Sequence, residues 1–173
     1  GRYFLANSPR QYDVVAIDAY RPPYIPFLLT TREVFAQVRE HLTEQGVVAI
    51  TVGRTPTDWS LVEALAGTLK AEFPNVYIVD LAQTTQDVGN VLVVATKQPT
   101  RLENFAANTE LLTDPILWQV ANKAMAHVSE FTAPTVIFTD DKAPVAFVFE
   151  PQTAGPNAIH VVLQSADGEG ILL

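Results

Sequence analysis

The residue best placed for chemistry is an acid that directly follows an apolar run near the start of the chain. Residues 14–17 read Val-Val-Ala-Ile, a continuous run typical of a strand covered on both faces of a parallel sheet, and Asp18 comes next. In open α/β sheets, ligands bind beyond the carboxyl ends of the strands. The pattern leaves two interpretations of Asp18 open, a catalytic or substrate-binding carboxylate and a helix cap or loop anchor.

Other candidates for a site lie in loops. Tyr20 would either stack on a substrate or be a half-buried loop residue, and prolines at positions 22, 23 and 26 would stiffen a gate loop. Asp140 and Asp141 would either line the mouth of the site or form a solvated turn before Pro144. The three histidines are scattered without metal-ligand spacing, so we expect no metal site.

Composition restricts the class of protein. The chain has 173 residues, of which 48% are hydrophobic and 17% charged, which suits one globular domain with a core. It has no cysteine, which excludes disulfides, thiolate metal sites and a cysteine nucleophile. The 11 basic and 19 acidic residues give a net charge of −8. This charge disfavours a nucleic-acid partner and favours a cationic small molecule.

Three amphipathic helices are predicted to support the strands. The first begins at a capping box formed by Thr30 and Glu33 and ends near Gly46. The second begins at residues 56–58, and the third has Asp114 as N-cap and Pro115 at its first position. Their apolar faces are Val34, Phe35, Val38 and Leu42; Leu61, Val62, Leu65 and Leu69; and Ile116, Leu117, Val120 and Met125.

Strands are predicted at 12–17, 47–52, 76–81 and 90–96, with two weaker strands at 145–150 and 158–163. This alternation is an α/β layout, in which strands joined by a helix run parallel with a right-handed crossover. The short link between 76–81 and 90–96 favours an antiparallel pair.

The strand at 12–17 lacks a partner in this sequence. Its continuous apolar character is typical of a central strand, yet only eleven residues precede it. We expect its open edge to be covered by a second copy, by an amino-terminal segment, or by the tail strand at 158–163. An intermolecular contact is favoured because half a sheet leaves much apolar surface exposed.

Several segments resemble spermidine synthases, and more closely the spermidine synthase-like domains of bacteria, some of which are fused behind membrane segments. The resemblance rests on residues 1–5 (GRYFL), 12–20 (YDVVAIDAY), 25–26 (IP), 29–35 (LTTREVF) and 42–52. Residues 139–145 (TDDKAPV) resemble the TDD-x-APVE stretch near the end of those domains, with Ala146 in place of Glu. The similarity covers about residues 1–145, which leaves 146–173 as a tail of uncertain structure.

The resemblance implies an α/β fold with a Rossmann-like, S-adenosylmethionine-dependent methyltransferase-type sheet, helices on both faces, and strand order 3-2-1-4-5-7-6. The family's glycine-rich turn and the acid that holds the nucleoside ribose lie in the first half and are absent from this sequence. The chain would then be the carboxyl-terminal half, strands 4-5-7-6. We expect the order 12–17, 47–52, 90–96, 76–81, with the last strand antiparallel to its neighbours.

The resemblance also implies roles for residues around the first strand. Asp18 matches the catalytic acid that orients the attacking amine of putrescine or accepts its proton. It further implies substrate contacts for Tyr20, Arg21 and Asp140, contacts of Ala19 and Pro26 with the co-substrate decarboxylated S-adenosylmethionine, and no metal. The family commonly reads D-S-S-D-P where residues 18–22 read DAYRP. A cation at Arg21 would repel a diamine.

Three functions therefore stay open. The chain would be a fragment of an enzyme that transfers an aminopropyl group to a polyamine such as putrescine, a nucleoside-binding transferase with a different acceptor, which Arg21 favours, or a noncatalytic domain of this family. Expected partners are a polyamine, a nucleoside, and a second copy or a missing amino-terminal half. No apolar run is long enough to span a bilayer, no signal peptide is visible, and the first residue is Gly, so the sequence is expected to begin within a longer gene. We expect a cytoplasmic protein, or a full-length protein held on the cytoplasmic side of a membrane.

Overall fold

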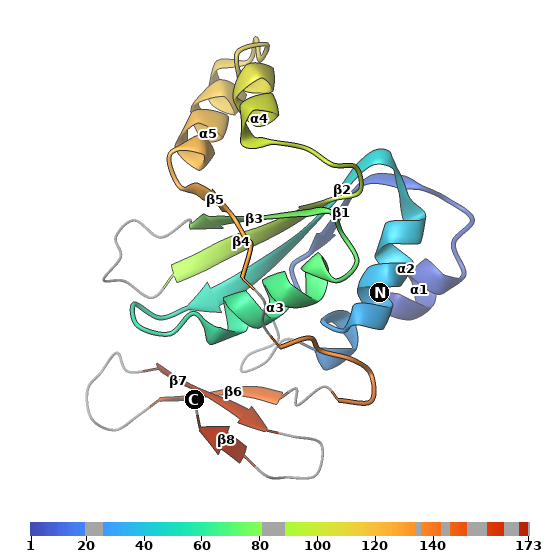
Figure 1. The fold of residues 1–173 in the computed structure, drawn as a ribbon, viewed down its shortest axis with the longest axis vertical. Helices are drawn as coiled ribbons and strands as arrows, with labels where there is room; N and C mark the ends of the chain where they lie inside the picture. The colour runs from blue at the N-terminus through green and yellow to red at the C-terminus, as the bar shows by residue number, and fades with distance from the viewer. Residues whose placement is uncertain are drawn as a thin grey trace.

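The main feature of the fold is a five-stranded mixed sheet, seen in a computed structural model (Figure 1). The structure describes residues 1–19, 26–80, 89–133 and 136–142, and the backbone of strands within 146–172. The sheet order is β1-β2-β4-β3-β5. These strands are β1 (Tyr12–Ile17), β2 (Leu42–Arg54), β3 (Asn75–Asp80), β4 (Gly89–Thr96) and β5 (Val128–Glu130).

Strand directions agree with the prediction. β1 pairs with β2 in parallel, whereas β4 is antiparallel to both β2 and β3. The predicted order of the four main strands, which the resemblance assigned to strands 4-5-7-6, is therefore confirmed. The short strand β5, which pairs antiparallel with β3, was not predicted.

Helices cover the two faces of the sheet unequally. Helices α1 (Arg2–Ala6), α2 (Arg32–His41) and α3 (Ser60–Lys70), with the 3-10 turn η1 (Phe27–Leu29), lie together on one side in Figure 1. Helices α4 (Leu102–Thr109) and α5 (Pro115–Met125) form a hairpin that projects from the other side. Among the described residues, no helix is long and apolar enough to cross a membrane.

Helices α2 and α3 form because their apolar residues recur on one face, and that face is buried as predicted. The predicted core residues of both helices are at most 3% exposed: Val34, Phe35, Val38, Leu42, Leu61, Val62, Leu65 and Leu69. They pack against every second residue of the strands, including Val48, Ile50 and Val52 of β2. At about 25 cal/mol per Å², burial of these side chains is the largest stabilising contribution to the domain.

The predicted capping box at the start of α2 is wrong. The N-cap is Thr31, and neither threonine caps the helix with its side chain. The Thr30 hydroxyl donates to the Phe27 carbonyl at 2.8 Å, and the Thr31 hydroxyl donates to Asp140 at 2.7 Å. A partner 109 residues away in sequence has therefore replaced the local cap.

The end of α2 also differs from the prediction. The helix stops at His41 and β2 begins at once, so Gly46 lies within the strand. Tyr12 pairs with Leu42 whereas Val14 pairs with Val47, so β2 bulges between these two contacts. A Cβ added to Gly46 would lie 2.9 Å from Leu42 Cβ and 3.0 Å from the Tyr12 carbonyl oxygen. Glycine is needed here for close backbone approach, not to end a helix.

Helix α5 begins as predicted but is not buried as predicted. The Asp114 carboxylate accepts from the backbone N–H groups of Ile116 and Leu117, and Pro115 occupies the first turn. Yet α5 has no buried residue, and Ile116, Leu117 and Val120 are 70%, 55% and 61% exposed. Nothing in the described part of the chain covers this face.

One face of strand β1 is exposed, which corrects the expectation that both of its faces are covered, and β1 lies at an edge of the sheet with the open side that was expected. Val14 is 60% exposed, and β1 has a recorded pairing only with β2 within the described residues. Val15 and Ile17 do pack against the core from the helix-covered side. The expected neighbour on the outer edge is therefore missing from the described chain.

The tail forms its own antiparallel sheet. β6 (Ala146–Pro151), β7 (Ile159–Gln164) and β8 (Gly170–Leu172) follow one another in the order β6-β7-β8. The two weak strands predicted here are confirmed, and β8 is an addition. Because β7 pairs with β6 and β8, it does not cover the edge of β1, which the sequence had offered as one possibility.

Candidate active site

Asp18 lies at the carboxyl end of β1, on the rim of the sheet. Ile17 pairs with Ile50, so Asp18 is the first residue beyond the paired segment. The neighbouring strand β2 continues to Arg54. Its side chain is exposed, and no hydrogen bond or ion pair is recorded for it among the described residues. It is neither a helix cap nor a recorded loop anchor. A solvent-accessible carboxylate here can hold a cationic amine or accept a proton from one.

A buried ion pair lies further along the same rim. Arg54, the last residue of β2, donates to the carboxylate of Asp80, the last residue of β3, at 2.7 Å. The Arg54 side chain is 1% exposed and the Asp80 side chain 22%. The guanidinium also lies 4.9 Å from the centre of the Trp59 ring, a cation–π contact that fixes the loop before α3. This pair joins the carboxyl ends of two strands.

Asp140 forms part of a second polar cluster, which we call the clasp (Arg2, Thr31, Glu33 and Asp140). Arg2 donates to both carboxylate oxygens of Asp140, at 2.9 and 2.5 Å, and the Thr31 hydroxyl donates to one of them at 2.7 Å. The Asp140 backbone N–H donates to Glu33 Oε2 at 3.0 Å. The clasp connects α1, the start of α2 and the segment 136–142.

The clasp changes the acidity of its carboxyl group. Hydrogen bonds from Arg2, together with the Thr31 hydroxyl and the charge of Arg2, lower the pKa of Asp140, although partial burial opposes them. The same bond raises the pKa of the Arg2 guanidinium. Because both Asp140 oxygens already accept hydrogen bonds, a substrate amine would have to compete with Arg2 for them. Asp140 therefore serves first as an anchor of the fold.

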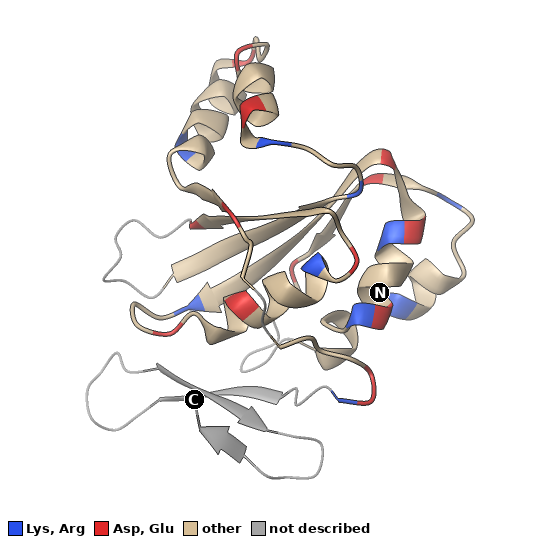
Figure 2. Ribbon diagram, viewed as in Figure 1, with Lys and Arg blue, Asp and Glu red and all other residues tan. Residues whose placement is uncertain are grey.

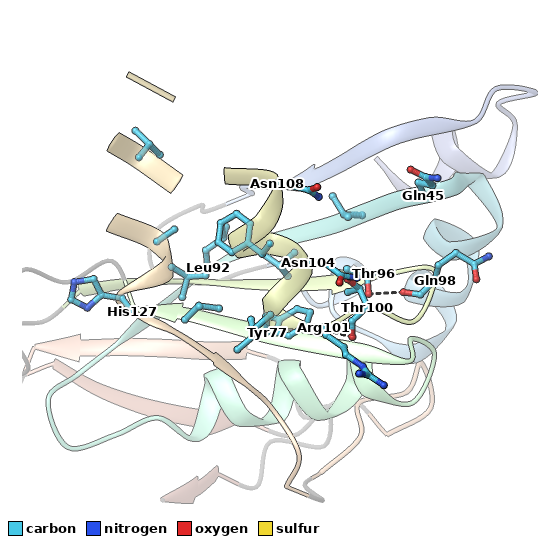
Figure 3. Close-up of a pocket in the computed structure, with 18 of the residues that line it drawn as sticks. Gln45, Tyr77, Leu92, Thr96, Gln98, Thr100, Arg101, Asn104, Asn108 and His127 are labelled. Carbon is cyan, nitrogen blue, oxygen red and sulfur yellow. Dashed lines mark hydrogen bonds between the residues drawn. The ribbon is translucent and has the colours of Figure 1, made fainter. Parts of the chain in front are cut away.

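A cavity lies between the sheet and the α4–α5 hairpin (Figure 3), and Asp18 is not among the residues that line it. Its volume is about 1060 Å³. Leu92 and Val94 of β4 and Tyr77 of β3 line its floor, and Phe105 and Val120 line the hairpin side. In Figure 3 amide side chains gather at one end, around Gln98 and Asn108, and His127 lies at the other. Asp18 is not among the lining residues, whereas Asp80 of the buried ion pair is, so the cavity reaches the rim at β3 and not at β1.

Comparisons with known proteins relate this arrangement to one family. No protein-family model matches the chain. The chain is 28% identical to a probable polyamine aminopropyl transferase of Bifidobacterium longum (strain NCC 2705) over 195 aligned positions, which cover 97% of this chain and 40% of the relative. It is also similar to the structure of a probable spermidine synthase from Corynebacterium glutamicum ATCC 13032, with a TM-score of 0.50 and 20% identity over 71% of this chain and 50% of that chain.

A second solved structure, a spermidine synthase in complex with the transition-state analogue AdoDATO, gives a TM-score of 0.50 and 21% identity over 71% of this chain and 45% of that chain. The resemblance to the spermidine synthase-like family is confirmed. The fold is the methyltransferase-like fold of spermidine synthases. The chain spans only 40% of its curated relative and at most half of these two solved chains.

The rim of the sheet contains only part of the predicted set of site residues. Tyr20 and Arg21 lie outside the described residues. Ala19 follows Asp18 and is half-buried, and Pro26, also half-buried, precedes η1. Asp140 lies in the clasp, and no recorded contact brings it together with Asp18. The roles predicted for these residues stay predictions.

The Arg54–Asp80 pair and the clasp were not found by reading the sequence. For Arg54 a signal existed. The alternation of buried residues along β2 places Val48, Ile50 and Val52 toward the helices, and Arg54 continues that series. A buried cation needs an anionic partner, which could have been sought at the ends of neighbouring strands. No comparable local signal identifies Arg2 as the partner of Asp140.

Proposed function

We propose that this chain is the acceptor-side part of a polyamine aminopropyl transferase that acts as a piece of a larger enzyme. The observation that carries the proposal is Asp18, an exposed carboxylate at the carboxyl end of β1 that has no partner among the described residues, in a fold shared with spermidine synthases. The likeness to a probable polyamine aminopropyl transferase supports the reaction class. Residues 1–145 would form the transferase part and 146–173 a separate tail.

In the proposed reaction, the Asp18 carboxylate holds the acceptor amine and accepts a proton as that amine attacks. The amine nitrogen forms a bond to the methylene carbon beside the sulfonium of decarboxylated S-adenosylmethionine. The carbon–sulfur bond breaks, its electron pair returns to sulfur, and neutral methylthioadenosine leaves. The amine proton passes to the carboxylate and then to water. Alignment of nitrogen, carbon and sulfur would supply much of the rate enhancement.

The contacts for the nucleoside are not assigned to this chain. The family's glycine-rich turn and ribose acid are absent from the sequence. We therefore propose that the outer edge of β1 is covered by an amino-terminal half or by a second copy that supplies them. On this proposal the chain alone does not bind methylthioadenosine.

A second candidate is a nucleoside-binding transferase with a different acceptor. It is favoured by Arg21, a cation where the family commonly has an acid. Putrescine carries two positive charges, so a nearby guanidinium would weaken its binding. An acceptor with one amine or with an anionic group would fit better. A noncatalytic domain is the third candidate.

The decisive experiment replaces Asp18 in the full-length protein. Asp18→Asn should lower kcat for release of methylthioadenosine by roughly 100-fold or more, because a positioned general base contributes about 10²–10⁴-fold. Calorimetry should find the Kd for methylthioadenosine changed less than about 3-fold. Asp13→Asn is the matched control, because Asp13 is an exposed acid of the same strand that accepts from the Thr43 hydroxyl. It should leave kcat within about 2-fold.

Three outcomes separate the candidates. Unchanged kcat in Asp18→Asn refutes the catalytic role of this residue. Turnover with other amines but not with putrescine supports the second candidate. If the full-length protein binds no nucleoside and transfers to none of a panel of amines, the noncatalytic domain is the better description.

A further inference from the structure

The α4–α5 hairpin carries an apolar surface that nothing in the described chain covers. Six of its large apolar side chains are between 36% and 76% exposed: Leu111, Leu112, Ile116, Leu117, Trp118 and Val120. They surround the first turns of α5 and the link from α4, which Figure 1 shows farthest from the sheet. We call residues 110–117 the hairpin tip. Six large apolar side chains exposed close together are unfavourable in water, and a surface of this kind typically marks a contact with a partner.

A complementary apolar hollow lies at the other end of the same hairpin. The cavity of about 1060 Å³ is bounded by the sheet face and by the turns of α4 and α5 nearest to it. Leu92, Val94 and Val79 provide its sheet side, and Phe105 provides part of its helical side. We call this end, with residues 101–105 and 123–127, the hairpin foot. An apolar tip and an apolar hollow therefore lie at opposite ends of one element.

The two ends of the hairpin also differ in charge. The tip carries Glu110 and Asp114 and has no basic residue. The foot carries Arg101 and Lys123, together with the acid Glu103. None of these five has a recorded ion pair in the part of the chain that the structure describes. Figure 2 shows acidic positions at the tip and basic positions at the foot, with one acidic position in α4 near the foot.

We propose that the hairpin is a self-association surface, and that two copies pack with their hairpins antiparallel so that each tip lies at the foot of the other. This arrangement places Glu110 and Asp114 of one copy near Lys123 and Arg101 of its mate. The parallel arrangement would instead bring four acids together. A two-fold axis makes each contact occur twice, so one apolar tip and one hollow suffice for a closed dimer.

The dimensions of the hairpin agree with this arrangement. The 11 residues of α5 span about 16 Å along the helix axis, so two antiparallel hairpins overlap over their whole length. The dimer would bury the six exposed side chains of each copy in two apolar patches, one at each contact between a tip and a foot. The charged residues at both ends would then lie at the rim, where they select orientation more than they add affinity.

A lipid surface is the other occupant that an apolar tip with a tryptophan next to it, Trp118, suggests. Membrane-binding helices usually carry Lys and Arg on their polar face and are attracted to anionic lipids. The tip carries only acids, and the chain has a net charge of −8, so anionic bilayers would repel it. The charge distribution therefore favours a second copy over a membrane.

The test measures self-association of the chain by sedimentation velocity between about 1 and 100 µM. We expect a dimer whose Kd rises at least 10-fold in Ile116→Asp, because a carboxylate would be buried in the apolar contact between tip and foot. Tyr3→Asp is the matched control, because Tyr3 is 84% exposed but lies in α1. It should leave Kd within about 2-fold. Circular dichroism melts of all variants check that folding is unchanged.

Charge reversals test the antiparallel orientation. Glu110→Lys and Lys123→Glu should each raise Kd by about 3- to 10-fold, and the double variant should return it to within about 2-fold. A monomer at 100 µM overturns the proposal. So does a dimer that is insensitive to Ile116→Asp but broken by Val14→Lys, which would place the contact at the β1 edge. Binding of the monomer to neutral phosphatidylcholine vesicles that Ile116→Asp abolishes would favour a membrane instead. None of these outcomes depends on aminopropyl transfer.

Discussion

The clasp gives a prediction whose size can be worked out from its geometry. Asp140→Asn removes the negative charge that Arg2 contacts through two hydrogen bonds, at 2.9 and 2.5 Å, and leaves an amide beside the Thr31 hydroxyl. Charge-assisted hydrogen bonds contribute about 1.5–3 kcal/mol when shielded, but the Arg2 and Asp140 side chains are 26% and 35% exposed. Solvent screening reduces such pairs to about 0.2–1 kcal/mol. With the Thr31 bond added, we expect a loss of about 1–2 kcal/mol.

The assay is urea unfolding at neutral pH, followed by far-ultraviolet circular dichroism. A double-mutant cycle with Arg2→Gln should give a coupling energy of about 0.5–1 kcal/mol between Arg2 and Asp140. Asp141→Asn is the matched control, because Asp141 is exposed and has no recorded partner among the described residues. Coupling indistinguishable from zero, or equal losses in Asp140→Asn and Asp141→Asn, would refute the clasp as a stabilising contact.

The pH dependence of the same variant has a definite sign. The folded-state pKa of Asp140 is lowered, so its contribution is fully present above the ordinary range of an aspartic acid, near pH 4. That contribution is lost as the pH falls through the lowered folded-state pKa. The difference in unfolding free energy between the wild type and Asp140→Asn should therefore be constant from pH 5 to 7 and shrink below pH 4. A difference that grows on acidification would contradict the assignment.

Two further predictions concern the rim and the cavity. Asp80→Asn should cost about 2–4 kcal/mol in urea unfolding, because it removes the negative charge that Asp80 places 2.7 Å from the buried Arg54 guanidinium. Glu44→Gln should cost less than about 0.5 kcal/mol, because the Glu44 side chain is 77% exposed and lies 3.5 Å from Lys97. Equal costs would contradict this. Burial, and then the charges of Glu130 and Glu103, raise the pKa of Tyr77, so ultraviolet titration should find one tyrosine ionising above the ordinary value near 10, and Tyr77→Phe should remove that step. Because the neutral form is favoured in the fold, Tyr77 should lose its stabilising contribution as the pH rises through that raised pKa.

Local sequence patterns correctly predicted the features that depend on residues close together in the sequence. The faces of α2 and α3 and the antiparallel link between β3 and β4 follow from periodicity and from one short connection, and the structure has all of them. Asp114 was found because an N-cap bonds to residues two and three positions later, here Ile116 and Leu117. In each case the cause and the partner lie within a few residues of one another.

The wrong predictions concern features that depend on residues or elements far away in the sequence. The cap expected at Thr30 is not formed: the helix begins one residue later, the Thr30 hydroxyl donates to the Phe27 carbonyl, and the Thr31 hydroxyl donates to Asp140, far along the chain. The apolar face of α5 was predicted to be buried, since its spacing resembles that of α3, but burial also requires an element to cover it. Helix α4, which has little apolar periodicity and one buried residue, was not predicted at all.

The position of Asp18 suggests how sheet completion and chemistry would be connected. An exposed carboxylate is surrounded by water, which weakens its interaction with a substrate cation because the local dielectric constant is high. A strand added beside β1 would extend the rim next to Asp18, exclude part of that water and strengthen the interaction with an amine. The same strand would satisfy the open backbone groups of β1 and cover Val14, which is now 60% exposed. The segment that completes the sheet would thus also complete the site. We therefore expect Val14→Lys in the full-length protein to lower kcat as well as stability, although Val14 itself touches no reacting atom.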